Sequence, residues 1–238
     1  MINPDNVPIV PFEQRDTIRL ISTAYIDEPA LTPLVDDEDE LDFLASIEEL
    51  TSSRQNTGMP LPSGIFAQEL LNEHDGYGWT YVNAAFCYTR STGNRFNGPD
   101  RGAWYASWGE GAVETAHAEV SWHLTRELEA TGIYENITNY RELIASFIID
   151  MHDLREFADD DIFASDPHQA YPQGQALAAS LRQSGSQGII YPSVRRAGGL
   201  CLAAFRPRSV QNVRQGDTWK FEWSGDPTPK IMKGEGSI

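Results

Sequence analysis

The stretch that decides the fold class is GAWYASW at residues 102–108, followed by GAVETAHAEVSWHLTRELE at residues 111–129. The first part is short and rich in aromatic residues, which is typical of a strand. In the second part apolar residues recur at helical spacing and mark one buried stripe, formed by Val113, Ala116, Val120, Leu124 and Leu128. A strand that runs directly into an amphipathic helix is therefore expected in the middle of the chain.

The flanking sequence adds strands and helices without a regular repeat. Strands are predicted at residues 17–23 (TIRLIST), 144–151, 188–194 (GIIYPSV), 199–205 (GLCLAAF) and 218–223 (TWKFEW). Helices are predicted at 37–54, 65–72 and 169–183, whereas 79–88 (WTYVNAAFCY) fits a strand or a helix and 93–99 (GNRFNGP) is a loop. The turn-rich tail from Ser224 onward is expected to fray. This irregular mixture favours an α+β fold over a doubly wound sheet.

Length and charge restrict the classes of protein. The 238 residues suffice for one core and contain no Pro/Gly/Ser-rich linker, so a single domain over residues 1–238 is expected. The formal charge of −17 disfavours nucleic acid and acidic membranes as partners, since both require clustered basic residues. Part of the acidic excess lies at residues 36–40 (DDEDE), which form either the solvated start of a helix or a docking face for a basic partner.

The sequence also bears on the cellular location of the protein and on metal binding. No run approaches the ~20 consecutive apolar residues of a membrane span, and the first residues lack the features of a secretory signal. We therefore expect a cytoplasmic protein in which Cys87 and Cys201 are reduced, small buried side chains. His117 and His123 are six residues apart, which is not the spacing of one helix face, and no Cys/His cluster is present, so no metal site is expected.

Four segments combine a reactive polar side chain with an apolar strand or helix. They are residues 17–20 (TIRL), 94–97 (NRFN), 103–107 (AWYAS) together with 115–119 (TAHAE), and 191–195 (YPSVR). No GxGxxG, P-loop, HExxH or GxSxG motif accompanies them. Any catalytic chemistry is therefore expected from these four segments.

In these segments the chain resembles the RES-domain family, named for an arginine, a glutamate and a serine. Arg19 matches the arginine of the family's first strand, and residues 93–97 match its G-R-[WF]-[NS] loop with one residue inserted after the glycine. Residues 105–107 and 116–119 match the central Y-[LA]-A strand and A-x-x-E helix, and residues 192–193 match a late P-S. The ordered matches run from residue 17 to about 207. Many members carry Asn-Pro after the serine strand, where this chain has Phe-Arg-Pro at residues 205–207.

The resemblance implies an ADP-ribosyltransferase-like fold with mixed sheets and flanking helices. It also implies a toxin that consumes NAD⁺ as its substrate, cleaving the nicotinamide–ribose bond by phosphorolysis or hydrolysis with inorganic phosphate or water as acceptor. The implied partner is an antitoxin with an Xre-type helix-turn-helix domain. Two alternatives stay open, namely ADP-ribosyl transfer to a protein and a non-catalytic binding protein.

The chemistry of the matching residues fits that reaction. Nicotinamide leaves as a neutral molecule without a proton, so one carboxylate suffices where an ordinary glycosidase needs two. Glu119 is the expected carboxylate, and Arg19 and Arg95 are expected to bind the pyrophosphate through paired hydrogen bonds. Tyr105 is expected to stack on the nicotinamide, and Ser193 to bond a ribose hydroxyl or the carboxamide. Arg19 and Tyr105 thereby join Glu119 in the expected catalytic group.

Each of these residues also has a purely structural interpretation. Glu119 fits a solvated helix glutamate, Arg19 a salt-bridged strand arginine and Tyr105 a core tyrosine, and the Pro-Ser pair fits a strand entry. Arg101 and Arg195 are expected to be structural or to lie at the rim. The catalytic hypothesis requires the two arginines, the phenol and the carboxylate to meet in a common cleft sized for a dinucleotide.

Overall fold

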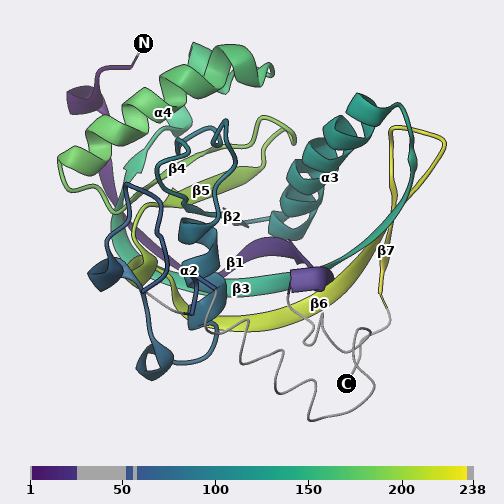
Figure 1. The fold of residues 1–238 in the computed structure, drawn as a ribbon. Coiled ribbons are helices and arrows are strands. Elements are labelled where there is room, and N and C mark those ends of the chain that lie inside the picture. Colours follow the sequence, from purple (N-terminus) through teal and green to yellow (C-terminus); the bar gives the residue numbers. More distant parts are fainter. Residues whose placement is uncertain (1, 26–51, 56–57, 235–238) are drawn as a thin grey trace, which may run out of the picture.

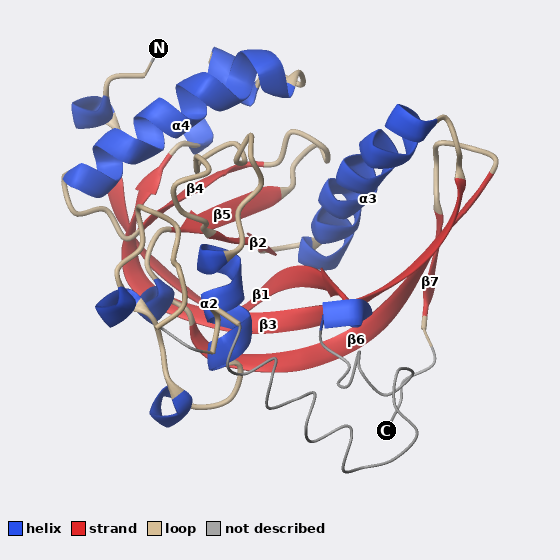
Figure 2. Ribbon diagram, viewed as in Figure 1, coloured by secondary structure: helices blue, strands red, loops and turns tan. Residues whose placement is uncertain are grey.

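The computed structural model describes residues 2–25, 52–55 and 58–234. Helices and a mixed sheet occur together, which confirms the α+β prediction (Figures 1 and 2). The strands are β1 (Ile9–Ser22), β2 (Trp104–Trp108), β3 (Glu135–Asp153), β4 (Gly188–Pro192), β5 (Leu200–Ala204), β6 (Gln211–Ser224) and β7 (Lys230–Lys233). The α-helices are α2 (Trp79–Cys87), α3 (Ala112–Thr131) and α4 (Pro167–Gln183).

Within the described ranges the strands form one seven-stranded sheet that partly closes on itself. The order is β1-β2-β5-β4-β3-β6-β7, and β1 pairs in addition with β3. The first five strands therefore form a closed ring of pairings, from which β6 and β7 continue outward. The β3–β4 pair is parallel, with His152 opposite Ile189, and the other pairs are antiparallel.

The two faces of the sheet bury separate cores. On one face, Trp104 of β2 packs with Phe86 of α2 and with residues of β3. On the other face, Tyr105 of β2 packs against the core beneath α4, which contains Leu177. Helix α3 packs on β1, where Ala116 contacts the cluster of Ile18. Because successive strand residues point to opposite faces, β2 separates the α2 side from the α4 side. Figure 1 shows α4 above β4 and β5, and α2 below them, in front of β1 and β3.

Most of the predicted elements are confirmed. The strand predicted at 17–23 is the end of β1, and the helices predicted at 111–129 and 169–183 are α3 and α4. The side chain of Asp166 caps α4 by accepting the amide of His168, and a proline follows at the first helical position. The ambiguous segment at 79–88 is helix α2. The strand predicted at 144–151 is the second half of the longer β3.

Two predictions were wrong. Residues 65–72 form no α-helix but a single 3₁₀ turn at Ala67–Glu69, because Asn83 binds both the amide and the carbonyl of Leu71, at 3.0 and 2.9 Å. The tail does not fray from Ser224, since β7 pairs with β6 after a turn in which Asp226 accepts the amide of Thr228 at 2.7 Å. Pairing with a neighbouring strand thus overrides the turn-rich composition.

Other predictions concern residues that lie outside the described ranges. The helix predicted at 37–54 falls there except for residues 52–54, and residues 53–55 form a turn. The acidic run at 36–40 also lies outside the described ranges. None of the helices in the described part of the chain is long and apolar enough to cross a membrane.

Candidate active site

The carboxylate of Glu119 is held by the loop that joins β4 to β5. Glu119 is half-buried on α3, and the hydroxyl of Ser193 donates to its Oε1 at 2.6 Å. The thiol of Cys201, on β5, contacts the same oxygen at 3.8 Å. Burial and this carboxylate raise the pKa of the Cys201 thiol, which therefore stays protonated beside Glu119. The direction of the Glu119 side chain is thus fixed by Ser193 of the β4–β5 loop and by Cys201 of β5.

The loop that carries Ser193 is itself ordered by that hydroxyl. Ser193 Oγ accepts the backbone amides of Arg195 and Arg196, each at 3.1 Å. The amide of Ser193 donates to the carbonyl of Gly199 at 2.8 Å, which closes the base of the loop. Ser193 therefore sets both the conformation of the loop and the direction of the Glu119 carboxylate.

Arg95 lies beneath α4 with 8% of its surface exposed. Its guanidinium donates to the carbonyls of Ile162 and Ala164 and lies 5.5 Å from the centroid of the Tyr171 ring. These contacts leave Arg95 as a buried cation at the centre of the segment predicted as a loop. The guanidinium is positioned by backbone carbonyls rather than by a carboxylate in the described residues.

Two glycines allow the loop of Arg95 to lie this close to α4. Gly93 has a φ of +65°, and a Cβ there would lie 2.1 Å from the carbonyl oxygen of Asn97. On α4, a Cβ at Gly174 would lie 2.3 Å from the carbonyl oxygen of Arg95. Neither position accommodates a side chain in this packing. The glycine of the family-like motif is therefore required by the backbone.

Tyr105 holds the same loop through its hydroxyl. The hydroxyl donates to Asn97 Oδ1 at 2.8 Å and accepts the amide of Phe96 at 3.0 Å. Burial raises the pKa of this phenol above its usual range. Both hydrogen bonds of the hydroxyl go to the 93–99 loop, and Tyr105 thereby fixes the segment that carries Arg95.

The structure does not bring Arg19 together with Glu119. The guanidinium carbon of Arg19 lies 5.0 Å from the centroid of the Trp104 ring, in the core on the α2 side. Glu119 contacts Cys201, which belongs to the core on the α4 side. Arg19 and Glu119 are therefore on opposite faces of β2, and the four predicted groups do not share one side of the sheet.

The contacts of Arg19 indicate a supporting role. Its Nη1 donates to the backbone carbonyl of Tyr105 at 3.2 Å. Burial lowers the pKa of the guanidinium to about 10, so Arg19 remains charged at neutral pH. From the α2 side of the sheet, Arg19 therefore holds strand β2, which carries Tyr105.

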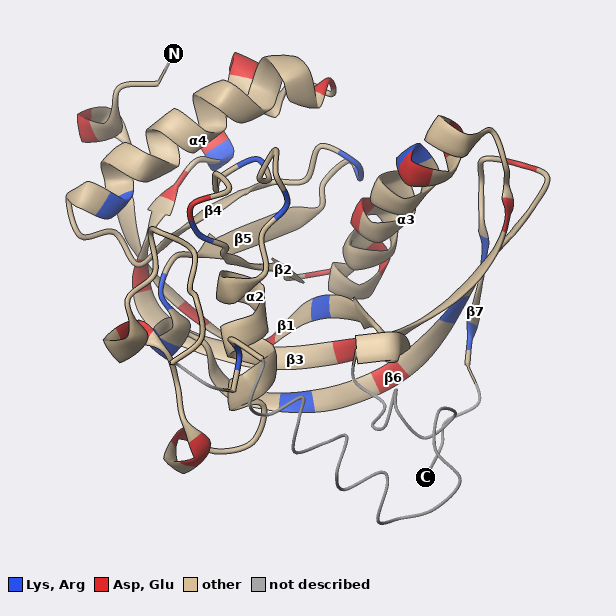
Figure 3. Ribbon diagram, viewed as in Figure 1, with Lys and Arg blue, Asp and Glu red and all other residues tan. Residues whose placement is uncertain are grey.

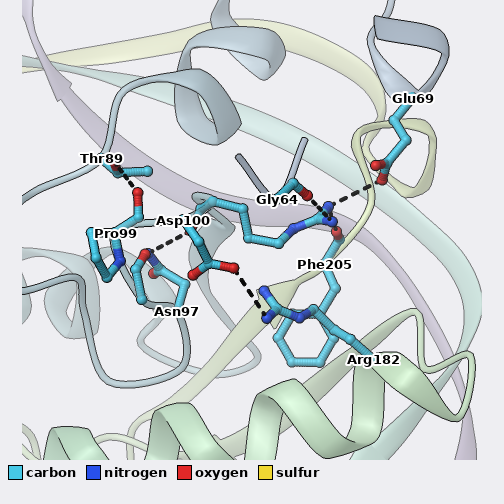
Figure 4. A network of polar contacts seen from close by, with 10 residues as sticks. Gly64, Glu69, Thr89, Asn97, Pro99, Asp100, Arg182 and Phe205 are labelled. Carbon is cyan, nitrogen blue, oxygen red and sulfur yellow. Dashed lines mark hydrogen bonds and ion pairs between the residues drawn. The ribbon is translucent and has the colours of Figure 1, made fainter. Parts of the chain in front are cut away.

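Arg101 is structural, as expected. Its guanidinium donates to the carbonyls of Gly64 and Phe205, both at 2.8 Å, and pairs with Glu69 at 3.1 Å (Figure 4). Its own carbonyl accepts the side-chain amide of Asn97 at 3.0 Å. Arg101 therefore ties the end of the 93–99 loop to distant segments and has few donors left for a ligand.

Several residues that the sequence analysis did not select lie around Glu119. Tyr171 of α4 is close to Arg95, Arg195 and Glu119, whose charges act on its pKa, although burial is the main reason why that pKa is raised. Tyr191, just before the Pro-Ser pair, has its pKa raised by burial first and by Glu119 among its neighbours. Its place in the motif-bearing segment 191–195 was the available signal. Both phenols are therefore near enough to Glu119 for its charge to act on them.

The described residues contain no group of three or more His, Cys, Asp or Glu side chains that would hold a metal ion. The ring of His117 packs edge-on against Trp219 and Phe221, at centroid distances of 4.4 and 5.4 Å. His117 thus belongs to the packing of α3 on β6.

Comparison with known proteins gives one family match. No curated protein matches the chain. The RES domain model matches residues 71–224, which include Arg95, Tyr105, Glu119 and Ser193. Arg19 lies before the matched range, although β1 is paired with both β2 and β3. Because the match covers more than half of the chain, the family is established: this protein belongs to the RES-domain family.

Proposed function

We propose that this protein cleaves NAD⁺ at the nicotinamide–ribose bond. The observation that carries the proposal is the Glu119 carboxylate, which Ser193 orients through a hydrogen bond of 2.6 Å. The membership of the chain in the RES-domain family supports the choice of substrate. Arg95 supplies a buried cation on the same side of the sheet for an anionic dinucleotide.

One carboxylate is chemically sufficient for this reaction. The pyridinium nitrogen carries a positive charge in NAD⁺, so the C–N bond breaks heterolytically, both electrons stay on nicotinamide and no proton is needed. The ribose carbon becomes cationic in the transition state, and a fixed carboxylate stabilises that charge. Phosphate or water then attacks the same carbon and completes the transfer.

The decisive experiment compares Glu119→Gln with the native protein by measuring nicotinamide release from NAD⁺. We expect a loss of ~10²–10³ in kcat for the variant, the scale of one preorganised electrostatic contact. Glu129→Gln is the matched control, because Glu129 is an exposed glutamate on the same helix. Equal turnover by native protein and Glu119→Gln would overturn the proposed role of the carboxylate.

The same assay identifies the acceptor. With NAD⁺ labelled in the adenosine half, hydrolysis yields free ADP-ribose, and phosphorolysis yields ADP-ribose phosphate only when phosphate is added. Label that remains on a macromolecule would instead indicate ADP-ribosyl transfer. Absence of any turnover would favour the alternative of a non-catalytic binding protein.

We also propose, from the family resemblance, that the activity is toxic and is neutralised by an antitoxin with an Xre-type helix-turn-helix domain. The net charge of −17 favours a basic partner of this kind. Expression in bacteria should deplete NAD⁺ and arrest growth, and Glu119→Gln should do neither. Growth arrest by both forms at equal NAD⁺ levels would contradict the proposal.

A further inference from the structure

A second group of side chains continues from Glu119 along the same face of α3. Trp122, His123 and Arg126 follow it at spacings of three, four and seven residues, which places them on one side of the helix. With a rise of 1.5 Å per residue, they extend the site by about 10 Å along the helix axis from Glu119. Figure 3 shows basic positions on α3 and on the β4–β5 loop beside it.

The ring of Trp122 contacts two arginines from different elements. The guanidinium carbon of Arg195, on the β4–β5 loop, is 3.3 Å from the centroid of the Trp122 ring, and that of Arg126 is 4.8 Å away. Arg195 also donates to the carbonyl of Ser165 at 3.1 Å. Stacking on an indole orients the planar guanidinium and leaves its edge donors available for an anion.

His123 lies beside Trp122, and four arginines act on its pKa. Its ring lies 5.0 Å from the ring of Trp122, and its pKa is lowered to about 4 by burial first and then by Arg90, Arg195, Arg126 and Arg95. The carboxylates nearby are Glu119, which acts on Arg195, and Glu127, which pairs with Arg90 at 2.8 Å.

We define these four arginines together with Trp122 and His123 as the arginine cluster. Its four elements are the segment after α2, the 93–99 loop, the outer half of α3 and the β4–β5 loop. In a chain with a formal charge of −17, four cations around one neutral imidazole concentrate positive potential at a single point. Of these four arginines, Arg90 is itself paired with a carboxylate, that of Glu127.

We propose that the arginine cluster binds the diphosphate of the substrate. In the substrate this diphosphate is one ribose away from the bond whose cleavage we assign to Glu119. The inference rests on the proposed function for the identity of the substrate. Arg126 and Arg195, both in contact with the Trp122 ring, supply guanidinium donors, and Arg95 adds a buried cation. This assignment moves the phosphate site away from Arg19, which lies on the other face of β2. The ligand class is an organic diphosphate ester, for which ADP is the simplest probe.

Binding of ADP by titration calorimetry tests the assignment. Arg126→Gln and Arg195→Gln should each weaken ADP binding by about tenfold, the value of one charge-assisted hydrogen bond to phosphate. Arg208→Gln removes the same charge from the exposed pair with Asp75 and should change the Kd by less than about twofold. Arg126 is exposed, so its variant is expected to fold normally even if Arg195→Gln does not. Equal ADP affinity in Arg126→Gln and Arg208→Gln would overturn the proposal.

The NMR titration of His123 gives an independent readout. A bound diphosphate stabilises the imidazolium, so ADP should move the His123 midpoint upward from about 4, with the resonance assigned through His123→Gln. An unmoved midpoint at saturating ADP would place the anion elsewhere and refute the assignment.

The two proposals fail in distinguishable ways. If the native protein cleaves NAD⁺ and the two variants Arg126→Gln and Arg195→Gln have the same KM for NAD⁺ as the native protein, the proposed function stands. The arginine cluster is then rejected as the phosphate site. Native protein that binds ADP through these arginines but releases no nicotinamide keeps the diphosphate site and rejects the cleavage reaction.

Discussion

Ser193 Oγ lies 2.6 Å from Glu119 Oε1 and joins the β4–β5 loop to helix α3. This single hydrogen bond connects two motifs that are far apart in the sequence. A hydroxyl that donates to a carboxylate restricts the rotation of that carboxylate. The bond therefore fixes the direction of the carboxylate to which we assign the cleavage reaction.

Ser193→Ala should lower kcat for NAD⁺ cleavage by about tenfold, because one charge-assisted hydrogen bond to the carboxylate is lost. KM should change much less, since the arginines that bind the anion remain. Ser193→Thr keeps a hydroxyl and should restore most of the rate. Ser184→Ala, which removes a hydroxyl bonded to backbone carbonyls of α4, serves as the control. A tenfold rise in KM at constant kcat would mean that Ser193 binds the substrate directly.

Tyr105→Phe should destabilise the protein by about 1–3 kcal/mol, because the amide of Phe96 loses its acceptor and Asn97 a donor inside the fold. Urea unfolding measures this loss. Tyr77→Phe is the control, since the Tyr77 hydroxyl bonds Gln215 at an exposed position and its removal should cost less than about 0.5 kcal/mol. Equal costs would show that the buried hydroxyl does not anchor the loop.

Gly93→Ala and Gly132→Ala separate backbone strain from crowding. Both glycines have nearly the same positive φ, +65° and +68°, but a Cβ at Gly132 meets nothing within 4 Å. The left-handed conformation alone should cost about 1 kcal/mol at Gly132. At Gly93 the contact with the carbonyl of Asn97 adds to it, and we expect a total of about 3 kcal/mol or more. Similar unfolding free energies for the two variants would remove the argument from close packing.

Stability should fall as the pH drops from 6.5 to 4 in part because of His123. The unfolded chain takes up a proton near pH 6.5, whereas the folded protein does so only near pH 4, so the unfolded state binds more protons within this window. His123→Gln should reduce the slope of unfolding free energy against pH by up to about 1.4 kcal/mol per unit there. His117 and His152, whose pKa values are also lowered by burial, contribute equally to both proteins. Parallel profiles would contradict the lowered pKa of His123.

The sequence was most informative where one element carries its own signals. The apolar stripe of α3 and the Asp–Pro start of α4 identify these helices without reference to other parts of the chain. Strands β1 and β3 were predicted too short. The missed first half of β1 pairs with the predicted second half of β3, and the missed first half of β3 pairs mainly with β6. Long-range pairing leaves no local pattern in either strand.

The sequence predicted those site residues that belong to family-like motifs. Glu119 and Ser193 were both selected from family-like segments, and the structure places them in contact. The sequence could not predict to which face of the sheet the Arg19 side chain points. That direction depends on how β1 and β2 pair, which they do at Ile18 and Ser107. Trp122 and Arg126 follow Glu119 at helical spacing, but only the fold brings Arg195 to them.

The closure of the sheet through β1 determines how this protein must be truncated for expression. A fragment cut at the limits of the family match, residues 71–224, would lack β1 and β7. Removing β1 would leave unpaired backbone along β3 and β2, and such open edges recruit other chains into aggregates. Any shortened version intended for crystallisation or assay should therefore extend at least from Ile9 to Lys233.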